Sequence, residues 1–298
     1  MKAPLAGPNP LLDRTVVVTG AARGIGAAVA RDLAGRGARL ALLGHEPDEL
    51  RALAAGLPTP ALAHEVDVTD QAAMERAAAL VRERLGAPSA VVANAGVAEG
   101  APFADSDLAA WRRIIDVNLN GSAVTARTFL PDLFDTRGYY LQVASLASFG
   151  AAPMMSAYCA SKSGVEAFAH SLRAEVAHRG VAVGIGYLNW TDTGMIRDGD
   201  RYPVLRELRG HMPPPARRVH PAELVAARLA SAVERRSTAV YIPRWLRLVQ
   251  ATRAALPPLV LRVSRRALAR LEPEEPLRPT GALGAGGQAD RAAAGRSG

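Results

Sequence analysis

Short runs of apolar residues alternate along the chain with longer segments in which apolar residues recur every three or four positions. The short runs are continuous rather than interrupted by polar residues, which is typical of strands buried on both faces of a sheet. They predict strands over residues 14–20, 38–44, 62–68, 89–96, 139–145 and 181–187, and a short last strand over 238–242. The longer segments predict helices over residues 24–36, 47–55, 70–86, 156–179 and 221–235, and one long helix or a pair over 106–136.

This order predicts an α/β fold with a Rossmann-like, doubly wound parallel sheet between two layers of helices. We predict a single domain over residues 10–245, because the alternation ends there. Between the last two strands, residues 194–218 form a loop-rich insert that contains several prolines. An insert at this place is typical of a substrate lid.

The C-terminal quarter of the chain has a different pattern. Residues 241–271 predict two amphipathic basic helices separated by Pro257-Pro258, of which 246–271 form an extension to the domain. We favour packing of this extension on the domain or on a partner subunit. The alternative is a weak contact with a membrane surface through residues 241–271. Residues 272–298 are rich in Gly, Ala and Pro, so we expect a disordered tail.

Charge and composition restrict the classes of partner. The net charge is +8, but residues 201–270 alone contain 15 Arg and 3 Glu, so the basic surface is local. We expect no nucleic-acid binding, because no aromatic platform accompanies these arginines, and we predict no metal site. The chain has one cysteine, no signal-like apolar segment near its start and no long apolar run. We therefore expect a cytoplasmic protein, with a location peripheral to the membrane as the alternative.

The sequence "TGAARGIG" at residues 19–26 connects the first predicted strand to the first helix. Gly20, Gly24 and Gly26 permit a tight turn and a close approach of the backbone, around Ile25, to a phosphate. The helix that follows presents free N–H groups to a pyrophosphate. At the first strand–helix junction of a βα repeat, this pattern predicts a dinucleotide site.

A second pattern, "YCASK", places Tyr158 and Lys162 one helical turn apart. Only two of the 36 basic residues are lysines, and Lys2 is the other. A compact ammonium beside a phenol stabilises the phenolate and lowers the pKa of the Tyr. Retention of this one internal Lys favours a catalytic Tyr-Lys pair over a solvated surface pair.

With these two motifs the sequence resembles the short-chain dehydrogenase/reductase family, whose patterns are T-G-x-x-x-G-x-G and Y-x-x-x-K. Other landmarks of the family follow in order between residues 14 and 245. They are Asp67 and Val68 after the third strand, Asn94, Ala95 and Gly96 after the fourth, Asn118 in the next helix, and Ser145 after the fifth strand. The resemblance implies that residues 10–245 are an NAD(P)-binding catalytic domain.

The resemblance also implies the role of each residue. Tyr158 is the general acid/base, Ser145 polarises the substrate oxygen, and Lys162 holds the nicotinamide ribose. Asn118 holds a water in a proton relay, although an Asn that caps or fills a helix kink is the alternative. The implied reaction interconverts a secondary alcohol and a ketone, or an alcohol and an aldehyde, by hydride transfer. The rival is a catalytically silent cofactor-sensing or membrane-associated binding protein on the same fold.

The choice of cofactor depends on residues near the second strand. That strand ends "LLGHEP", with no acidic residue until Glu46, whereas an acid at the strand end would favour the free 2′-OH of NAD. Arg23 and His45 are placed to meet a 2′-phosphate, so we favour NADP(H) and keep NAD(H) as the alternative. The resemblance implies that Asp67 bonds the adenine.

The chain departs from the family after the sixth strand. Leu188 and Asn189 stand where the family has Pro-Gly, while Thr191 and Thr193 remain to bind the carboxamide or pyrophosphate. The residues that could form an apolar wall for a hydrophobic alcohol or ketone, or could be ordinary core, are Met154, Met155, Tyr187, Trp190 and Met195. The resemblance implies a homodimer or homotetramer formed through the helices at 106–136 and 156–179.

Overall fold

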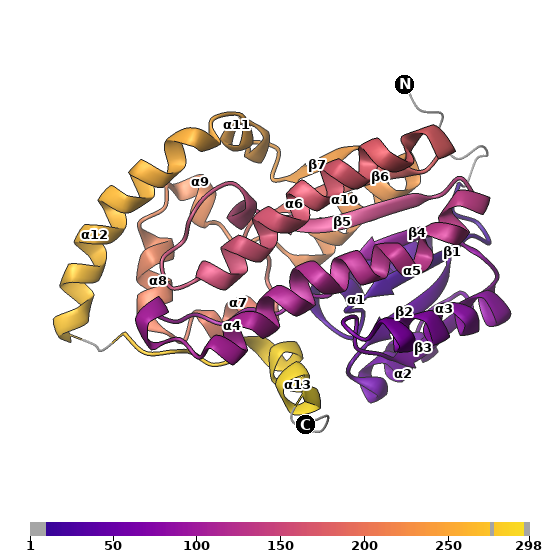
Figure 1. Cartoon of the computed structure of the whole chain (residues 1–298), viewed down its shortest axis with the longest axis horizontal. Helices are drawn as coiled ribbons and strands as arrows, with labels where there is room; N and C mark the ends of the chain where they lie inside the picture. Colours follow the sequence, from indigo (N-terminus) through magenta and orange to yellow (C-terminus); the bar gives the residue numbers. More distant parts are fainter. Residues whose placement is uncertain (1–9, 275–276, 295–298) are drawn as a thin grey trace.

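The computed structural model describes residues 10–274 and 277–294 and contains one seven-stranded parallel sheet (Figure 1). The strand order is β3-β2-β1-β4-β5-β6-β7. It reverses direction between β1 and β4, and a doubly wound sheet binds its ligands at such a switch point. The strands are β1 (Thr15–Thr19), β2 (Arg39–Gly44), β3 (Ala61–Glu65), β4 (Pro88–Ala93), β5 (Tyr139–Ser145), β6 (Ala182–Leu188) and β7 (Ala239–Ile242).

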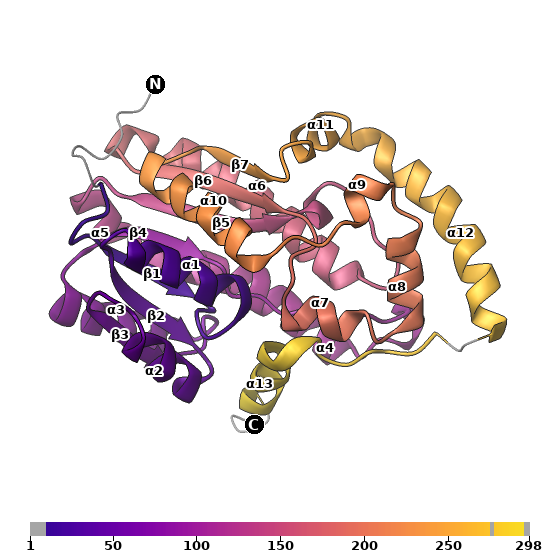
Figure 2. The same ribbon diagram turned by 180° about the vertical axis from the view of Figure 1, so that it is seen from behind.

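Helices cover both faces of the sheet, as Figures 1 and 2 show from opposite sides. Val17 of β1 packs on one face with α3 (Gln71–Leu85), α5 (Gly121–Asp135) and α6 (Ser156–Val176). Val16 and Val18 pack on the other face with α1 (Gly24–Gly35), α2 (Pro47–Ala55) and α10 (Ala222–Arg235). Successive side chains point to opposite faces of a strand, so both faces require apolar residues. The predicted three-layer fold is confirmed.

The structure defines two helical regions in more detail than the sequence does. The predicted helix or pair over 106–136 is α4 (Leu108–Ile115), a π-helical segment (Asp116–Asn120) and α5. The insert over 194–218 contains three short helices rather than mainly loop: α7 (Gly194–Gly199), α8 (Pro203–Gly210) and α9 (Pro214–Arg217). Two of these three begin at Pro. Proline fits the first turn of a helix, because an N–H group there would have no acceptor within the helix.

The basic extension contains α11 (Leu246–Ala251) and α12 (Leu256–Glu274), with a 3₁₀ turn between them. Pro257 and Pro258 lie in the first turn of α12, where prolines are tolerated. In Figure 1, α12 forms the outer edge of the molecule beside α8, and it packs on that helix. The predicted division of the chain at residues 245 and 271 stays a prediction.

Buried Glu166 of α6 joins the extension to the sheet. Its carboxylate accepts hydrogen bonds from Tyr187 Oη at 2.9 Å and from Gln250 Nε2 at 2.7 Å. Arg253 forms an ion pair with the second oxygen at 3.0 Å. A buried carboxylate needs such partners to offset its lost hydration. The start of the extension is therefore fixed to α6 and β6.

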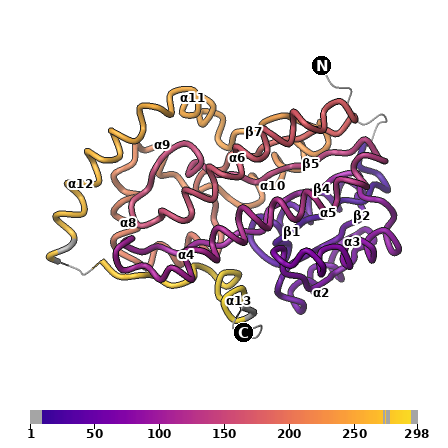
Figure 3. The backbone as a smooth tube through the Cα atoms, viewed as in Figure 1, coloured from indigo at the N-terminus to yellow at the C-terminus, as the bar shows by residue number. Residues whose placement is uncertain are grey.

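The structure differs from the expected disorder of residues 272–298. Residues 272–274 end α12, and residues 277–294 run back beside the loop after β4 and form α13 (Gly284–Ala294), as the tube in Figure 3 shows. Composition alone gives this segment no core, but Leu283 and Asp290 are buried against the domain. Contacts with the domain therefore replace the core that the segment lacks. Residues 275–276 and 295–298 of the expected tail lie outside the described residues.

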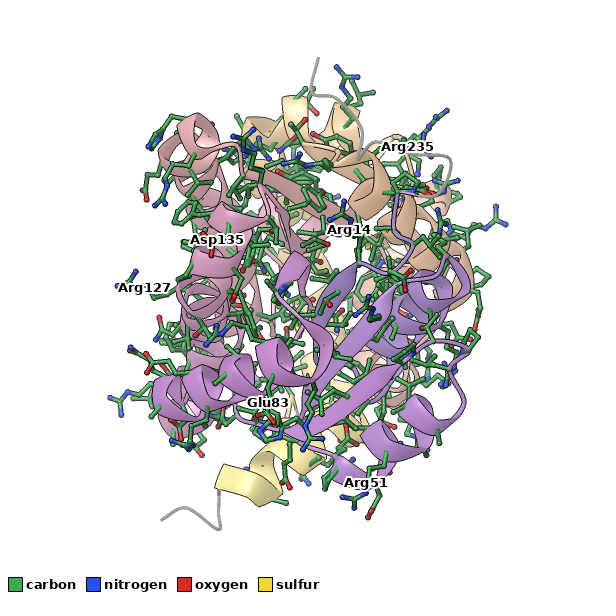
Figure 4. All side chains as sticks on the ribbon, turned by 90° about the vertical axis from the view of Figure 1, so that its right-hand side faces the viewer. Arg14, Arg51, Glu83, Arg127, Asp135 and Arg235 are labelled. Atoms are coloured by element: carbon green, nitrogen blue, oxygen red, sulfur yellow. The ribbon has the colours of Figure 1, made fainter. Side chains whose placement is uncertain are left out.

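The end of the molecule that lies opposite α12 carries exposed charges of both signs. Figure 4 views that end and labels Arg14, Arg51, Glu83, Arg127, Asp135 and Arg235, all of which are exposed. Within the described residues, no helix is long and apolar enough to span a bilayer.

Candidate active site

The glycine loop between β1 and α1 has the geometry of a phosphate cradle. Gly20 and Gly24 have φ angles of +61° and +52°, a region that L side chains rarely adopt. A Cβ at Gly26 would collide with the carbonyl oxygen of Gly20 and lie 2.7 Å from Asn94 Nδ2. That Asn94 amide donates to the carbonyl oxygens of Thr19 and Gly20, both at 3.1 Å. Asn94 thus fastens the loop to the end of β4, and this backbone fits a dinucleotide pyrophosphate.

Three side chains meet at the carboxyl end of β5. Ser145 is the last residue of the strand, and its hydroxyl is close enough to Tyr158 of α6 to lower the pKa of that phenol. Lys162, one turn further along α6, has its Nζ 5.6 Å from the centroid of the Tyr158 ring. The hydroxyl of Ser148 donates to the Lys162 carbonyl oxygen at 2.8 Å, which holds α6 against the turn after β5. The fold therefore brings together residues that are up to 17 positions apart in the sequence.

Burial controls the protonation of this cluster. It raises the pKa of Tyr158 to about 12, although the hydroxyl of Ser145 acts in the opposite direction. Burial also lowers the pKa of Lys162 to about 8. Desolvation disfavours the charged form of both groups. The pKa of Tyr158 is therefore raised by burial, whereas the sequence predicts that Lys162 lowers it.

Asn118 lies within the π-helical segment and is fully buried. Its Oδ1 accepts from Val97 N at 2.8 Å, and its Nδ2 donates to Val97 O at 3.0 Å and to Ser161 Oγ at 2.9 Å. Single π turns in α-helices are frequent at functional sites. Asn118 therefore fills the irregular turn and also contacts the helix of Tyr158, and its place in a proton relay stays a prediction.

Charged side chains gather at the end of the cleft near β2 and β3. Arg23 pairs with Glu46 and with Glu49, the latter at 2.5 Å. The pKa of Asp67 is lowered because its hydrogen bonds with Thr69 and Arg113 outweigh its burial.

Three further residues, Arg113, Asp290 and His45, gather with Asp67 at this end of the cleft. Arg113 NH2 lies 2.7 Å from Asp67 and 2.6 Å from Asp290 of α13. His45 Nε2 lies 3.3 Å from Asp290. The guanidinium of Arg113 therefore links α13 to the residue that the resemblance assigns to adenine.

The turn after β6 is held without Pro-Gly. Asn189 N donates to Ile242 O at 2.9 Å, and Asn189 Nδ2 donates to Ala216 O at 3.0 Å. A Cβ at Gly24 would lie 3.3 Å from the methyl group of Thr193. Thr193 is therefore next to the glycine loop, as its expected pyrophosphate contact requires.

One cavity of about 1590 Å³ joins these parts. The predicted positions that line it include Gly20, Ile25, Asn94, Ala95, Gly96, Val68, Thr191 and the Ser145–Tyr158–Lys162 cluster. Of the five candidate wall residues, Met155, Trp190 and Met195 line the cavity. Tyr187 packs in the core, and Met154 is buried away from the lining. Cys159, the only cysteine, also lines it, and burial raises the pKa of its thiol.

A sequence model of the short chain dehydrogenase family matches residues 14–201. The chain belongs to this family. The resemblance drawn from the motifs is thus confirmed, and the protein is an oxidoreductase of the short-chain dehydrogenase/reductase (SDR) family.

Among relatives of this SDR is the D-beta-hydroxybutyrate dehydrogenase of Rhizobium meliloti (strain 1021). It is 36% identical over 178 residues, which cover 58% of this chain and 69% of that protein. The acetoacetyl-CoA reductase of a Synechocystis species is 33% identical over 202 residues, covering 66% and 81%. A short-chain type dehydrogenase/reductase from Mycobacterium marinum superposes with a TM-score of 0.70 at 24% identity, covering 78% of this chain and 94% of that one, and it has the same fold.

Sequence reasoning missed two groups of residues in this SDR. Arg113 is one of many arginines and carries no motif, and Asp290 lies in the segment expected to be disordered. The apolar wall from the C-terminal half was also missed, because helical periodicity does not indicate what a face packs against. The members of that wall are Leu205, Leu208, Met212, Trp245, Val249, Leu256, Val260 and Val263.

Proposed function

We propose that this SDR interconverts a secondary alcohol and a ketone, with Tyr158 as the general acid/base. The observation that carries the proposal is the meeting of Ser145, Tyr158 and Lys162 in one cavity with the glycine loop. A nicotinamide dinucleotide, when bound, supplies the hydride donor or acceptor. The same residues also serve an alcohol and aldehyde pair.

The protein residues manage the proton. In the oxidation of an alcohol, Tyr158 removes the hydroxyl proton while the carbon loses a hydride, and in reduction it returns the proton to the carbonyl oxygen. The hydroxyl of Ser145 bonds the same oxygen and stabilises its developing charge. The ammonium of Lys162 favours the phenolate of Tyr158 and bonds ribose hydroxyls. Asn118 is the next member of the proton relay.

The binding of the dinucleotide is assigned to the cleft from the glycine loop to Tyr158. Gly20, Gly24, Ile25 and Gly26 take the pyrophosphate, as does Thr193. At the adenosine end, Asp67 and Val68 take the adenine. Between these ends, Asn94, Ala95 and Gly96 form the floor, and Thr191 takes the carboxamide. A Cβ at Gly96 would lie 3.5 Å from Lys162 Nζ, so this floor leaves room for a ribose against the Lys.

The pairing of Arg23 favours NAD(H) over the NADP(H) that the sequence favours. A 2′-phosphate would have to draw the guanidinium away from Glu46 and Glu49 and to remain beside their carboxylates. The other residue expected to meet the phosphate, His45, faces Asp290. A free 2′-OH instead finds an acceptor in Glu46.

The proposed substrate is a bulky apolar alcohol or ketone. The cavity exceeds the range of about 300–1,000 Å³ that is usual for small-molecule sites, and its outer wall comes from the apolar residues of α8, α11 and α12. Part of this volume is for the dinucleotide. The remainder fits a ligand with a large hydrocarbon portion.

The test is a fluorescence titration of the protein with NADH and NADPH, followed by turnover assays on a panel of apolar alcohols and ketones. We expect tighter binding of NADH, turnover by the wild type, and loss of at least a thousandfold in kcat for Tyr158→Phe with binding retained. Glu46→Gln with Glu49→Gln should shift the preference toward NADPH. Normal NADH binding without turnover on any compound would favour the cofactor-sensing alternative.

A second candidate function is peripheral contact with a membrane, which would give apolar substrates a route to the cavity. Leu248, Leu259 and Leu261 are 55–69% exposed on the basic extension, close in sequence to exposed arginines. Vesicles of phosphatidylserine and phosphatidylcholine should co-sediment with the wild type and much less with Leu248→Ser/Leu261→Ser. Leu12→Ser, an equally exposed position elsewhere, is the control. Equal sedimentation of all three proteins would contradict this candidate.

The proposed assembly is a homodimer or homotetramer formed through α4, α5 and α6. The family resemblance supports this proposal. Sedimentation equilibrium should give a mass of two or four times 31.3 kDa, and a monomer at micromolar concentration would contradict it.

A further inference from the structure

Helix α13 crosses the cleft that is assigned to the dinucleotide. At its first turn, Gly284 N donates to Asp198 of α7 at 3.0 Å, and a Cβ at Gly284 would lie 2.7 Å from Met195 N. Further along the helix, Asp290 lies 3.3 Å from His45, which follows β2. The helix therefore connects the wall after β6 to the wall after β2. A ligand extended from the adenine pocket to Tyr158 must pass beneath it.

The segment before α13 is attached through its main chain. Thr280 N donates to Gly100 O at 2.7 Å, Gly100 N donates to Thr280 Oγ1 at 2.9 Å, and Leu283 N donates to Ala98 O at 2.9 Å. Figures 1 and 3 show this segment passing along the α4 side of the molecule before α13 begins. These bonds fix one end of α13 beside the loop after β4.

The first turn of α13 borders the cavity with almost no side chains, whereas Leu283 before it and Asp290 further along line the cavity with full side chains. Gly284, Ala285, Gly286 and Gly287 border the same cavity as the glycine loop. Each Gly within a helix costs about 1 kcal/mol relative to Ala, so three in one turn disfavour the helix itself. Such a surface adds little bulk to the cavity that α13 and the glycine loop border together, as a cover rather than a plug requires.

Asp290 anchors the other end of α13. It is 3% exposed, and its two oxygens lie 2.6 and 3.0 Å from the guanidinium of Arg113. Burial disfavours the charge on Arg113, but hydrogen bonds to Asp290 and Asp67 outweigh it and raise the pKa of Arg113. A buried, bidentate pair of this kind is strong because the loss of either partner leaves an unpaired charge.

We propose that residues 277–294, the C-terminal strap, retain the bound dinucleotide, and that Asp290 is the positioning residue that holds the strap closed. The inference rests on the proposed binding of a dinucleotide in this cleft. The dinucleotide leaves when Asp290 separates from Arg113 and α13 moves away from the glycine loop. The strap makes no contact with the reacting atoms and acts on dissociation rather than on chemistry.

The experiment measures the dissociation rate of NADH by stopped-flow displacement in full-length wild type, Asp290→Ala and Gln288→Ala. Gln288 is an exposed neighbour on the same helix and is the matched control. We expect the rate to rise at least tenfold in Asp290→Ala and to stay within twofold in Gln288→Ala. Asp290→Asn keeps the shape without the charge and should give an intermediate rate.

A second measurement follows the strap itself. Trypsin cleavage after exposed Arg291 should slow severalfold when NADH saturates the wild type, and NADH should protect Asp290→Ala less. An unchanged dissociation rate in an Asp290→Ala protein that binds NADH would overturn the strap and leave the proposed function intact. Tighter binding by Asp290→Ala would also overturn it, because the strap would then compete with the dinucleotide. Failure of the wild type to bind either NADH or NADPH would instead overturn the proposed function, and this inference with it.

Discussion

At the scale of single residues, the site depends on two groups that burial displaces in opposite directions. Burial keeps Tyr158 protonated, which is the state in which its burial costs least, whereas Lys162 is still charged at pH 7 and loses its charge above about pH 8. Alcohol oxidation needs Tyr158 as the phenolate and Lys162 as the ammonium, which are the states that burial disfavours. The protein therefore maintains an unfavourable electrostatic arrangement at the point of reaction, as is common in active sites.

This arrangement predicts a pH dependence that differs between the two directions. At pH 7 nearly all Tyr158 is protonated, so the phenolate needed for alcohol oxidation increases about tenfold per pH unit. We expect kcat/KM for oxidation to rise nearly tenfold per pH unit, which is nearly a hundredfold from pH 6 to 8. The rise should weaken above about pH 8, where Lys162 loses its charge. Ketone reduction should stay flat from pH 6 to 8, and a reduction rate that rises with pH would contradict the assignment.

The buried charge of Lys162 also predicts a gain in stability when it is removed. A pKa lowered from 10.5 to about 8 means that the folded protein disfavours the ammonium at neutral pH, by a free energy on the order of 3 kcal/mol. Lys162→Met should therefore raise the free energy of unfolding by about 1–3 kcal/mol at pH 7 while it abolishes turnover. The gain should shrink between pH 8 and 10.5, because the wild-type Lys is then neutral when folded. Urea unfolding at pH 7 and pH 10 measures the gain in stability and its decrease with pH. A variant that is less stable than the wild type at pH 7 would refute this account.

The sequence predicted some residues of the site and not others for a physical reason. Tyr158 and Lys162 could be predicted as a pair because helix geometry fixes the distance between positions i and i+4. Ser145 could be predicted near them because it ends a strand, and parallel strands end at one edge of the sheet. Asp290 lies 177 positions from Arg113, and no local periodicity encodes a contact over that distance.

At the scale of elements, the strand-to-helix connections position the chemistry. Most strands and helices were predicted within a few residues, because continuous apolar runs and three-to-four spacing are local properties of the chain. The π-helical segment at Asp116–Asn120 was not, since it depends on the bonds between Asn118 and Val97 across the cleft. The short helices α7 to α9 contain too few turns for a pattern to appear.

The glycine loop predicts opposite effects of one substitution at two places in the same helix. Gly26→Ala would place a Cβ against the Gly20 carbonyl, so we expect a loss of about 1–3 kcal/mol in stability and at least a tenfold weaker NADH affinity. Gly35→Ala meets no atom within 4 Å and should stabilise the protein by about 0.5–1 kcal/mol. Thermal unfolding and NADH titration test the pair. Normal NADH affinity in Gly26→Ala would exclude this loop as the phosphate site.

At the scale of the whole molecule, the C-terminal half encloses a cleft that the sheet only begins. The insert and the basic extension supply the outer wall of the cavity, and the segment 277–294 borders its end near β2. The sequence predicted the sheet and an insert typical of a lid, but not which residues of the insert and the extension line the cavity, because the apolar faces of α8 and α12 do not specify their partners. Amphipathic periodicity indicates that a face is buried and leaves open whether protein, ligand or lipid covers it.

The enclosure predicts control of substrate size by α12. Val263 lines the cavity, whereas Leu261 on the same helix does not and is exposed. Val263→Trp should raise KM about tenfold for the bulkiest substrates and leave small alcohols and the NADH affinity unchanged. Leu261→Trp introduces the same side chain outside the cavity and should change neither. Equal KM changes for large and small substrates would show that α12 does not contact the substrate.

Cys159 gives this molecule a chemical reporter of its own cavity. Iodoacetamide can add at one thiol per chain, and that thiol lies in the cavity wall next to Tyr158. Burial keeps the thiolate scarce at neutral pH, so alkylation of the free protein should be slow. A compound that fills the cavity shields the sulfur further. The mass of the intact chain after timed labelling therefore measures occupancy of the site directly, and it ranks candidate substrates and inhibitors without an assay of turnover.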